Sequence, residues 1–178
     1  MNVRKVILYI ATSLDGYIAE TDGSIDFLTV ETDAPEEDNS YEELLERIDT
    51  VVLGRTTYDQ VVNELSPEQY PYEDKTSYII THHEKPENAD LIFTAEQPDK
   101  LVERLKKEEG KDIWIVGGGQ VITPLINCNL IDEYIVTTIP VILGQGIPLF
   151  QSIKQSVVLK SVDSYCKNGM ITSTYSKV

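Results

Sequence analysis

The sequence predicts a three-layer α/β/α fold, with a mostly parallel sheet and an antiparallel hairpin near the C-terminus. Short apolar segments typical of buried strands alternate with segments of helical periodicity over most of the 178 residues. A glycine run, Gly117–Gly119, connects one strand-like segment directly to a helix-like one. Asn168-Gly169 separates two further segments and is a strong hairpin signal. These observations indicate that the hairpin adds an antiparallel edge to a parallel sheet.

The individual elements follow from periodicity and composition. Buried strands are expected at residues 3–11, 50–53, 77–81, 91–94, 113–116 and 131–141. Helices with one apolar face are expected at residues 40–47, 58–65 and 121–126, and from Pro98 to a stop at Gly110. The hairpin strands are expected at 156–166 and 170–176. Ser40 and Glu43 have capping-box spacing, so Ser40 is the expected N-cap. The long irregular stretch 12–39 is typical of a functional or disordered loop.

Composition indicates one soluble domain over residues 1–178. No stretch approaches the length of a membrane span. The apolar N-terminal run soon meets Asp15 without a small-residue cleavage site, so a first strand is favoured over a signal peptide and a cytoplasmic location is expected. The formal net charge of −15 argues against nucleic acid and acidic membranes as partners.

Neither the cysteines nor the histidines indicate a metal site. Cys128 and Cys166 lack CxxC spacing and are expected to be small buried hydrophobic residues. His82 and His83 are adjacent, so on an extended segment they point to opposite faces and cannot bind one metal together. We therefore expect no metal.

The glycine run is the most informative motif of the chain. Glycine brings bare backbone against a ligand, and the free N–H groups of a following helix form an anion site. Strongly apolar flanks disfavour the alternative of a flexible linker, so a phosphate or pyrophosphate is the expected occupant. The usual G-x-G-x-x-G fingerprint fails because Ile122 takes its last glycine position, and no Gly-Lys-Ser/Thr follows. The loop belongs to another α/β arrangement.

Four motifs in order give the chain a resemblance to a known family. They are residues 10–19 (IATSLDGYIA), 53–58 (LGRTTY), the glycine run, and 143–150 (LGQGIPLF). The series resembles the dihydrofolate reductase-like superfamily, and is most similar to the C-terminal reductase domain of the bacterial bifunctional riboflavin-biosynthesis deaminase/reductase. The resemblance covers nearly the whole chain and implies a stand-alone, NADPH-dependent reductase. It also implies a homodimer, which the apolar hairpin and edge strand would support.

The resemblance also implies a cofactor site, position by position. In this resemblance the cofactor phosphates are bound by Gly54, Arg55, Thr56 and Thr57, and the pyrophosphate loop consists of Gly117, Gly118, Gly119, Gln120 and Val121. Thr81 and His82 lie beside the adenine and 2′-phosphate, and Ala11 and Ile18 lie beside the nicotinamide amide. Independently, Arg55 follows a strand and opens a helix, so its guanidinium and nearby N–H groups can converge on one anion. The alternatives are a solvated surface arginine for Arg55 and an ordinary strand end for Thr81 and His82.

The substrate half of the site is less defined. Asp15, near the expected nicotinamide pocket, and Asp26 are the candidate catalytic acids, with a turn and a capping role as their respective alternatives. A sugar phosphate requires cations between the first two strands, where Arg47 is accompanied mostly by acids at Asp33, Glu36, Glu37 and Asp38.

Two functions are therefore open. The first is an NADPH-dependent reductase of a small heterocycle, similar to either 5-amino-6-(5-phosphoribosylamino)uracil reductase or dihydrofolate reductase. The alternative is a non-catalytic NADP(H)-binding protein that has lost the chemistry.

Overall fold

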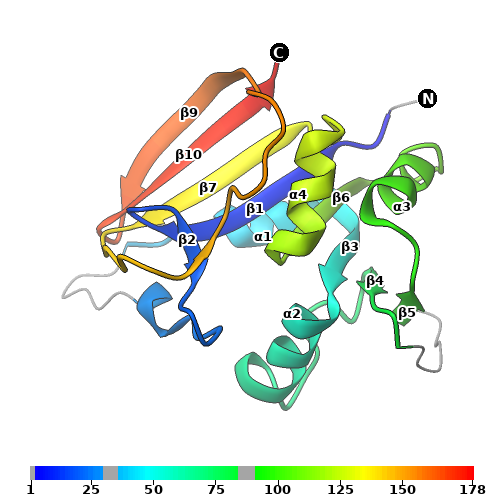
Figure 1. Cartoon of the computed structure of the whole chain (residues 1–178), viewed down its shortest axis with the longest axis horizontal. Coiled ribbons are helices and arrows are strands. Elements are labelled where there is room, and N and C mark those ends of the chain that lie inside the picture. Colours follow the sequence, from blue (N-terminus) through cyan, green and yellow to red (C-terminus); the bar gives the residue numbers. More distant parts are fainter. Residues whose placement is uncertain (1–2, 30–35, 84–90) are drawn as a thin grey trace.

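One eight-stranded sheet forms the centre of the computed structural model, which describes residues 3–29, 36–83 and 91–178 (Figure 1). Its strand order is β5-β4-β3-β6-β1-β7-β10-β9, and the first six strands are mutually parallel. Their bounds are Val6–Ser13 (β1), Ile48–Gly54 (β3), Thr76–Ile80 (β4), Leu91–Thr94 (β5), Asp112–Gly117 (β6) and Glu133–Ile139 (β7). The hairpin strands Leu159–Lys167 (β9) and Met170–Lys177 (β10) add the antiparallel edge. The predicted fold class is confirmed.

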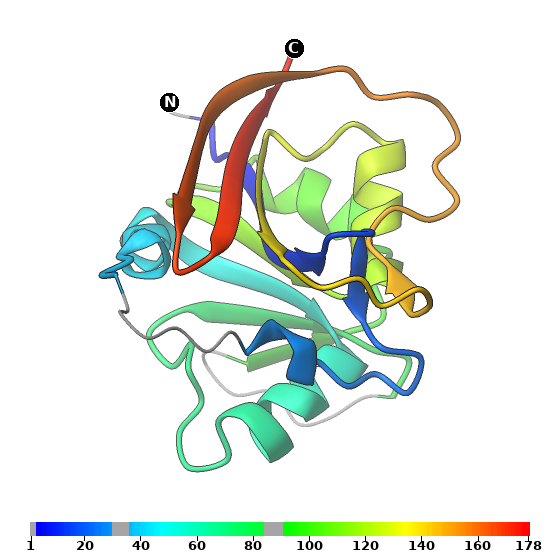
Figure 2. The ribbon, with the colours of Figure 1, turned by 90° about the vertical axis from the view of Figure 1, so that its left-hand side faces the viewer.

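Helices cover both faces of the sheet (Figure 2). Helix α1 (Ser40–Arg47) and helix α2 (Arg55–Gln60), which continues as one π-helical stretch (Val61–Leu65), pack on one face around an aromatic-rich cluster. Helix α3 (Pro98–Leu105) and helix α4 (Gly119–Asn127) pack on the other face around the larger aliphatic cluster. In α3 the buried residues Leu101, Val102 and Leu105 share one side, so periodicity alone locates this helix. Helix α4 runs through Pro124, which sequence analysis expected to delay or kink it.

A small second sheet lies outside the predicted elements. Strand β2 (Tyr17–Ala19) pairs antiparallel with the two-residue strand β8 (Ile147–Pro148), so the 13–19 segment and the 143–150 segment lie against each other. A Cβ at Gly146 would collide with the carbonyl oxygen of Ala19, which explains a glycine there. A short 3₁₀ turn (Asp26–Leu28) follows β2 and buries Phe27.

Three local expectations were wrong. The N-cap of α1 is Asn39, not Ser40, and the Ser40 hydroxyl instead contacts the Tyr9 hydroxyl at 3.1 Å. The helix expected from Tyr58 begins three residues earlier, at Arg55, because Gly54 ends β3. Cys128 and Cys166 are exposed rather than buried, since one follows the end of α4 and the other lies on the edge strand β9. Within the described residues, no helix is both long and apolar enough to cross a membrane.

Candidate active site

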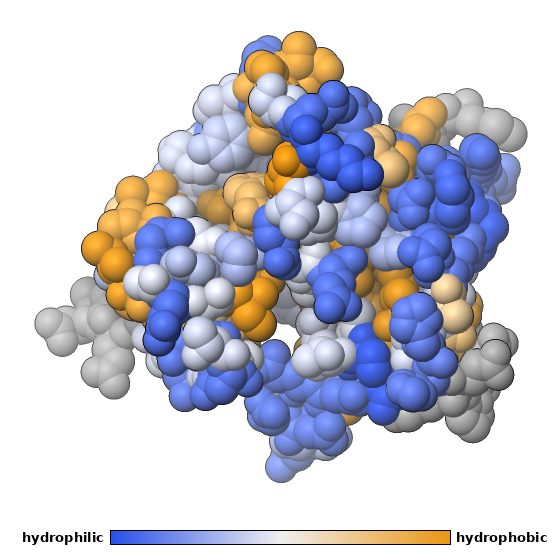
Figure 3. All heavy atoms as spheres, in the orientation of Figure 1, coloured by the Kyte–Doolittle hydropathy of each residue, from blue (hydrophilic) through white to orange (hydrophobic). Residues whose placement is uncertain are grey.

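The parallel strands bring the predicted cofactor residues to one edge of the sheet. In the order β4-β3-β6-β1, the carboxyl ends of these strands are neighbours, and they lead into Thr81, Arg55, Gly118 and the Asp15 turn. Sequence positions up to about a hundred residues apart therefore lie along one line. Figure 3 shows an opening through the molecule between the starts of α2 and α4 and the β2 segment. Ligands of open α/β sheets commonly bind at this edge.

The glycine run turns β6 directly into α4. Gly117 is buried with φ +129°, a conformation that favours glycine, and the Gly117–Gly118 peptide bond is cis. Gly118 is the N-cap, and its carbonyl accepts hydrogen bonds from the N–H groups of Val121 at 2.9 Å and Ile122 at 3.1 Å. The earlier N–H groups, on Gly119 and Gln120, have no acceptor within the helix. They are positioned to donate to an anion.

The start of α2 lies directly beside this loop. Leu53 pairs with Gly117 in the sheet, and a Cβ on Gly54 would lie 3.4 Å from Val121 Cγ2 and 3.9 Å from Gly118 N. A Cβ on Gly118 would in turn lie 3.4 Å from the Thr57 hydroxyl oxygen. Two helix starts therefore converge on the same space. The predicted residues Thr56 and Thr57 lie in the first turn of α2, and Val121 serves mainly to pack the two loops together.

Arg55 lies at this edge but already has a counter-charge. Its Nε donates a 2.7 Å hydrogen bond to Asp59, one helical turn later. The Arg55 side chain is 29% exposed, so the pair is partly solvated and the guanidinium keeps access to the opening. The sequence allowed Arg55 to be either a phosphate ligand or a solvated surface residue. In the structure Asp59 already binds its guanidinium and would compete with a phosphate.

Thr81 and His82 follow β4 at the outer end of the same line. Thr81 is buried, and its hydroxyl accepts the N–H of His83 at 3.1 Å, which is a local turn contact. His82 is exposed. His82 is therefore accessible from solvent, whereas the Thr81 side chain is buried and its hydroxyl is engaged in this turn.

The Asp15 carboxylate bridges two loops. It accepts hydrogen bonds from Ser13 Oγ at 2.7 Å, from Leu143 N at 3.1 Å and from Gly144 N at 2.7 Å. These bonds, the Ser13 hydroxyl first, hold the pKa of Asp15 below its ordinary value of 3.8. A carboxylate stabilised in its charged form is a poor proton donor, so the geometry favours the turn role over the catalytic one.

The remaining nicotinamide-side residues lie near this bridge. Ala11 lies near the carboxyl end of β1 and is half-buried, and Ile18 is the middle residue of β2. Asp26 begins the 3₁₀ turn and is exposed, and the hydrogen bonds in the described part of the chain give its carboxylate no partner. Neither candidate acid is therefore built into a proton-donating arrangement.

Two glutamines that sequence analysis missed join these segments to other parts of the chain. A Cβ on Gly119 would collide with Gln151 Nε2, so the Gln151 side chain lies over the start of α4. Gln60, in the last turn of α2, donates a 3.1 Å hydrogen bond to the carbonyl of Gly23 and ties α2 to the loop after β2. Both contacts join distant segments and have no local sequence signal.

Arg47, the cation that the sequence places among the acids between the first two strands, is held away from the candidate site. It forms hydrogen bonds of 2.9 and 3.0 Å with the two carboxylate oxygens of Glu133, and lies 3.6 Å from Asp112. Those acids are the first residues of β7 and β6, so Arg47 lies at the opposite edge of the sheet. Of the acids in the long loop, Glu36 and Glu37 are exposed and Asp38 is half-buried, and Asp33 falls outside the described residues.

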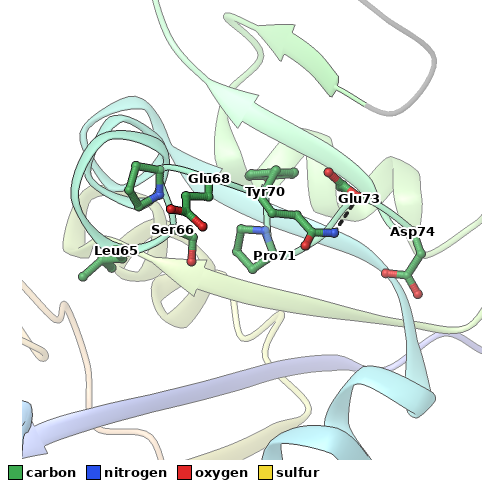
Figure 4. A pocket seen from close by; sticks show the side chains of 9 residues that line it. Leu65, Ser66, Glu68, Tyr70, Pro71, Glu73 and Asp74 are labelled. Carbon is green, nitrogen blue, oxygen red and sulfur yellow. Dashed lines mark hydrogen bonds between the residues drawn. The ribbon is translucent and has the colours of Figure 1, made fainter.

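A hollow on the described surface lies on the segment that follows α2 and is not lined by these residues. It has a volume of about 710 Å³ and is lined by a single segment, residues 65–71 with Glu73 and Asp74 (Figure 4). Glu68, Glu73 and Asp74 contribute carboxylates to it, and Gln69 bonds with Glu73 at 3.1 Å. An acidic, open depression is unsuited to a dinucleotide, so we keep the candidate site at the sheet edge.

The matches to known proteins extend over almost the whole chain. The model of the RibD C-terminal domain family matches residues 4–170. Two proteins of Bacillus subtilis (strain 168) are similar: YwjB is 43% identical over 88% of each chain, and YyaP is 32% identical over 97% of this chain and 94% of its own. These identities and coverages are high enough to establish shared ancestry along almost the whole chain.

Solved structures share the fold. A Shewanella sp. PV-4 protein, provisionally described as a riboflavin biosynthesis protein, matches with a TM-score of 0.83 and 28% identity over 98% of this chain and 99% of its own. A dihydrofolate reductase from Enterococcus faecalis, complexed with NADP(H), matches with a TM-score of 0.63 and 17% identity over 97% and 96% of the two chains. The chain belongs to the RibD C-terminal domain family and has the fold of the dihydrofolate reductase-like proteins.

Proposed function

We propose that the protein is an NADPH-dependent reductase that transfers a hydride to a small heterocyclic substrate. The observation that carries the proposal is the convergence of two helix starts, at Gly54–Arg55 and Gly118–Gly119, on one opening. Free amides and bare glycine backbone suit a diphosphate, because any side chain at Gly118 would fill the space above the amides. The family and the NADP(H) complex of the fold neighbour support the same cofactor.

Different residues along this edge of the sheet bind different parts of the cofactor. In this proposal the Gly117–Gln120 amides hold the diphosphate, Arg55 with Thr56 and Thr57 binds the adjacent phosphates, and His82 contacts the adenosine end. Ala11 and Ile18 orient the nicotinamide ring, which supplies the hydride when the cofactor is bound. Asp15 fixes the loop at Leu143 and Gly144, which leads into β8, rather than moving a proton.

The substrate half favours a heterocycle without a phosphate. All four arginines carry counter-charges: Arg4 with Asp49, Arg47 with Glu133, Arg55 with Asp59 and Arg104 with Glu96. Of these, Arg55 alone lies at the carboxyl edge, where it is assigned to the cofactor. This arrangement supports a pterin-like substrate over a phosphoribosyl-aminouracil.

A second function has one specific observation in its favour. Neither Asp15 nor Asp26 is arranged to donate a proton, which is what a non-catalytic NADP(H)-binding protein would show. Steady-state oxidation of NADPH with pterins, pyrimidines and quinones separates the two functions. Turnover of any of them supports the reductase, and tight NADPH binding without turnover across the panel supports the binding protein.

Cofactor binding itself is tested first. NADPH titrated into the free protein is expected to raise the melting temperature and to quench Trp114, which lies three residues before Gly117. No change at millimolar NADPH would overturn both functions. A homodimer is also proposed, because Val162 and Ile171 of the terminal hairpin are exposed apolar residues. Light scattering on the wild type and on Val162→Lys tests it.

A further inference from the structure

One face of the sheet is left partly uncovered near the expected nicotinamide end. Helix α1 buries the amino-terminal half of this face, including Ile7 and Trp114. Further along, Ala11, Thr137 and Val116 are only half-buried although they lie on the central strands β1, β7 and β6. A central strand is normally covered on both faces in a three-layer fold, so an uncovered strip indicates room for a ligand.

A row of hydroxyl groups crosses this strip. In the sheet register Ala11 is paired with Thr137, Thr137 with Thr172, and Thr172 with Tyr165, so all four residues point to the same face. Thr137 Oγ1 and Thr172 Oγ1 are 2.9 Å apart and satisfy each other. Tyr165 ends the row on the edge strand β9.

The Tyr165 hydroxyl is the unusual member of the row. Its oxygen is buried, and the described residues offer it no hydrogen-bond partner. Leaving a buried hydroxyl unpaired costs about 1–3 kcal/mol, so such groups in folded proteins call for a specific explanation. The Lys167 ammonium lies 5.7 Å from the centre of its ring, which holds the ring in place without using the hydroxyl.

A second hydroxyl pair lies on the same face. Tyr9, two residues before Ala11, has its hydroxyl 3.1 Å from Ser40 Oγ at the start of α1. Burial raises the pKa of Tyr9, and Asp38 and Tyr165 raise it further, so Tyr165 lies within electrostatic range of Tyr9. The Tyr9 hydroxyl therefore keeps its proton and can donate a hydrogen bond.

The charges around these hydroxyls restrict what they can bind. The Asp38 and Glu42 carboxylates act on Tyr9, and Lys167 lies over Tyr165, but Arg47 is at the other edge of the sheet. Within the described residues, the hydroxyl groups of Tyr9 and Ser40 bond to each other and not to a carboxylate. The two carboxylates disfavour a phosphate beside Tyr9, and Asp38 already accepts the N–H of Ser40 at 3.0 Å.

We propose that Tyr165, with Tyr9 and Ser40, recognises the substrate, and that these groups select an uncharged heterocycle that presents a carbonyl oxygen. This inference rests on the proposed reductase function for its location beside the nicotinamide, and it adds the substrate class. Tyr165 gains a partner when the ligand binds, whereas Tyr9 and Ser40 exchange or share their existing bond.

The test uses lumazine, a neutral pteridine with two carbonyl groups, and 2,4-diaminopteridine as its carbonyl-free counterpart. Calorimetric titrations are run with and without NADP⁺. The wild type is expected to bind lumazine at least tenfold more tightly than the diamino compound. Tyr165→Phe is expected to weaken lumazine about threefold to tenfold, the effect of one uncharged hydrogen bond. Tyr175→Phe is the matched control, because Tyr175 lies on the same hairpin and packs on the opposite face.

The melting temperature of the free variants gives a readout without any ligand. Removing an unpaired buried hydroxyl is expected to leave the stability of Tyr165→Phe unchanged or raised. A clear loss of stability, or equal lumazine affinity in Tyr165→Phe and wild type, or no lumazine binding at millimolar concentration, would overturn the proposal. If NADPH fails to bind, the proposed function is overturned. The lumazine titrations without NADP⁺ and the melting temperatures then still test the substrate site.

Discussion

Arg55 and Asp59 form a 2.7 Å ion pair across one turn of α2, at the edge of the sheet where the cofactor phosphates are proposed to bind. The pair gives the site an internal anion that competes with a phosphate for the same guanidinium. In a chain of net charge −15, Arg55 is a cation of the described residues that can attract a 2′-phosphate there.

Arg55→Ala is expected to weaken NADPH by about tenfold or more, because charge-assisted hydrogen bonds contribute about 1.5–3 kcal/mol. NADH, which lacks the 2′-phosphate, should lose much less. Asp59→Asn should tighten NADPH a few-fold and change stability by less than about 1 kcal/mol, as partly exposed pairs do. Arg104→Ala, which removes an exposed arginine paired with Glu96 and Glu108, is the control. Equal losses for the two nucleotides in Arg55→Ala would contradict the 2′-phosphate role.

Gly118→Val is expected to abolish NADPH binding while the protein still folds. Gly118 has φ −84° and ψ −160°, which other residues adopt, and its Cβ would make an ordinary 3.4 Å contact with Thr57. The added isopropyl group would stand over the amides of α4. Calorimetry and thermal melting measure the two effects. Gly117→Val is the contrasting variant, because φ +129° at Gly117 strains any side chain and should lower stability as well. Retained NADPH affinity in Gly118→Val would remove the loop from the site.

Gln151→Glu is expected to shift stability and affinity in opposite directions. The side chain lies over Gly119, so a carboxylate there would face the positive end of α4 and raise the melting temperature of the free protein. The same charge would repel a diphosphate and weaken NADPH by about tenfold, equivalent to roughly 1.4 kcal/mol. Gln151→Ala should weaken it less. NADPH binding to Gln151→Glu as tight as to wild type would show that Gln151 lies outside the site.

Asp15→Asn is expected to lower stability at neutral pH and to have little effect in acid. The pKa of Asp15 is below 3.8 in the folded protein, because the charged form accepts three hydrogen bonds. Its stabilising contribution is therefore complete above pH 3.8 and is lost as the pH falls through the lower folded value. Urea unfolding of both proteins from pH 7 to pH 2.5 should show a stability difference that shrinks only below about pH 4. A difference that grows in acid would require a raised pKa, which would suit a proton donor.

The sequence was sufficient for the elements and for the phosphate loop. The apolar run located β5 to the residue, Pro98 marked the start of α3, and Asn168-Gly169 located the hairpin, because these features depend on neighbours only a few residues away. Helix α3 ends at Leu105, before the stop expected at Gly110. The glycine run between a strand and a helix likewise carries its chemistry locally, in the backbone itself. The order of the motifs was enough to identify the family, which the domain match confirmed.

Only the tertiary structure decided which side chains reach the site. Arg47 looked available in the sequence, but the parallel arrangement puts the end of α1 beside the amino ends of β6 and β7, where Glu133 pairs with it. Asp15 became a bridge because a segment about 130 residues later presents its amides to it. Gln151 lies over Gly119 of α4, and Tyr165 is paired with Thr172 of β10; both positions depend on the tertiary fold. Strand order and register bring distant residues together, and local sequence patterns do not encode either of them.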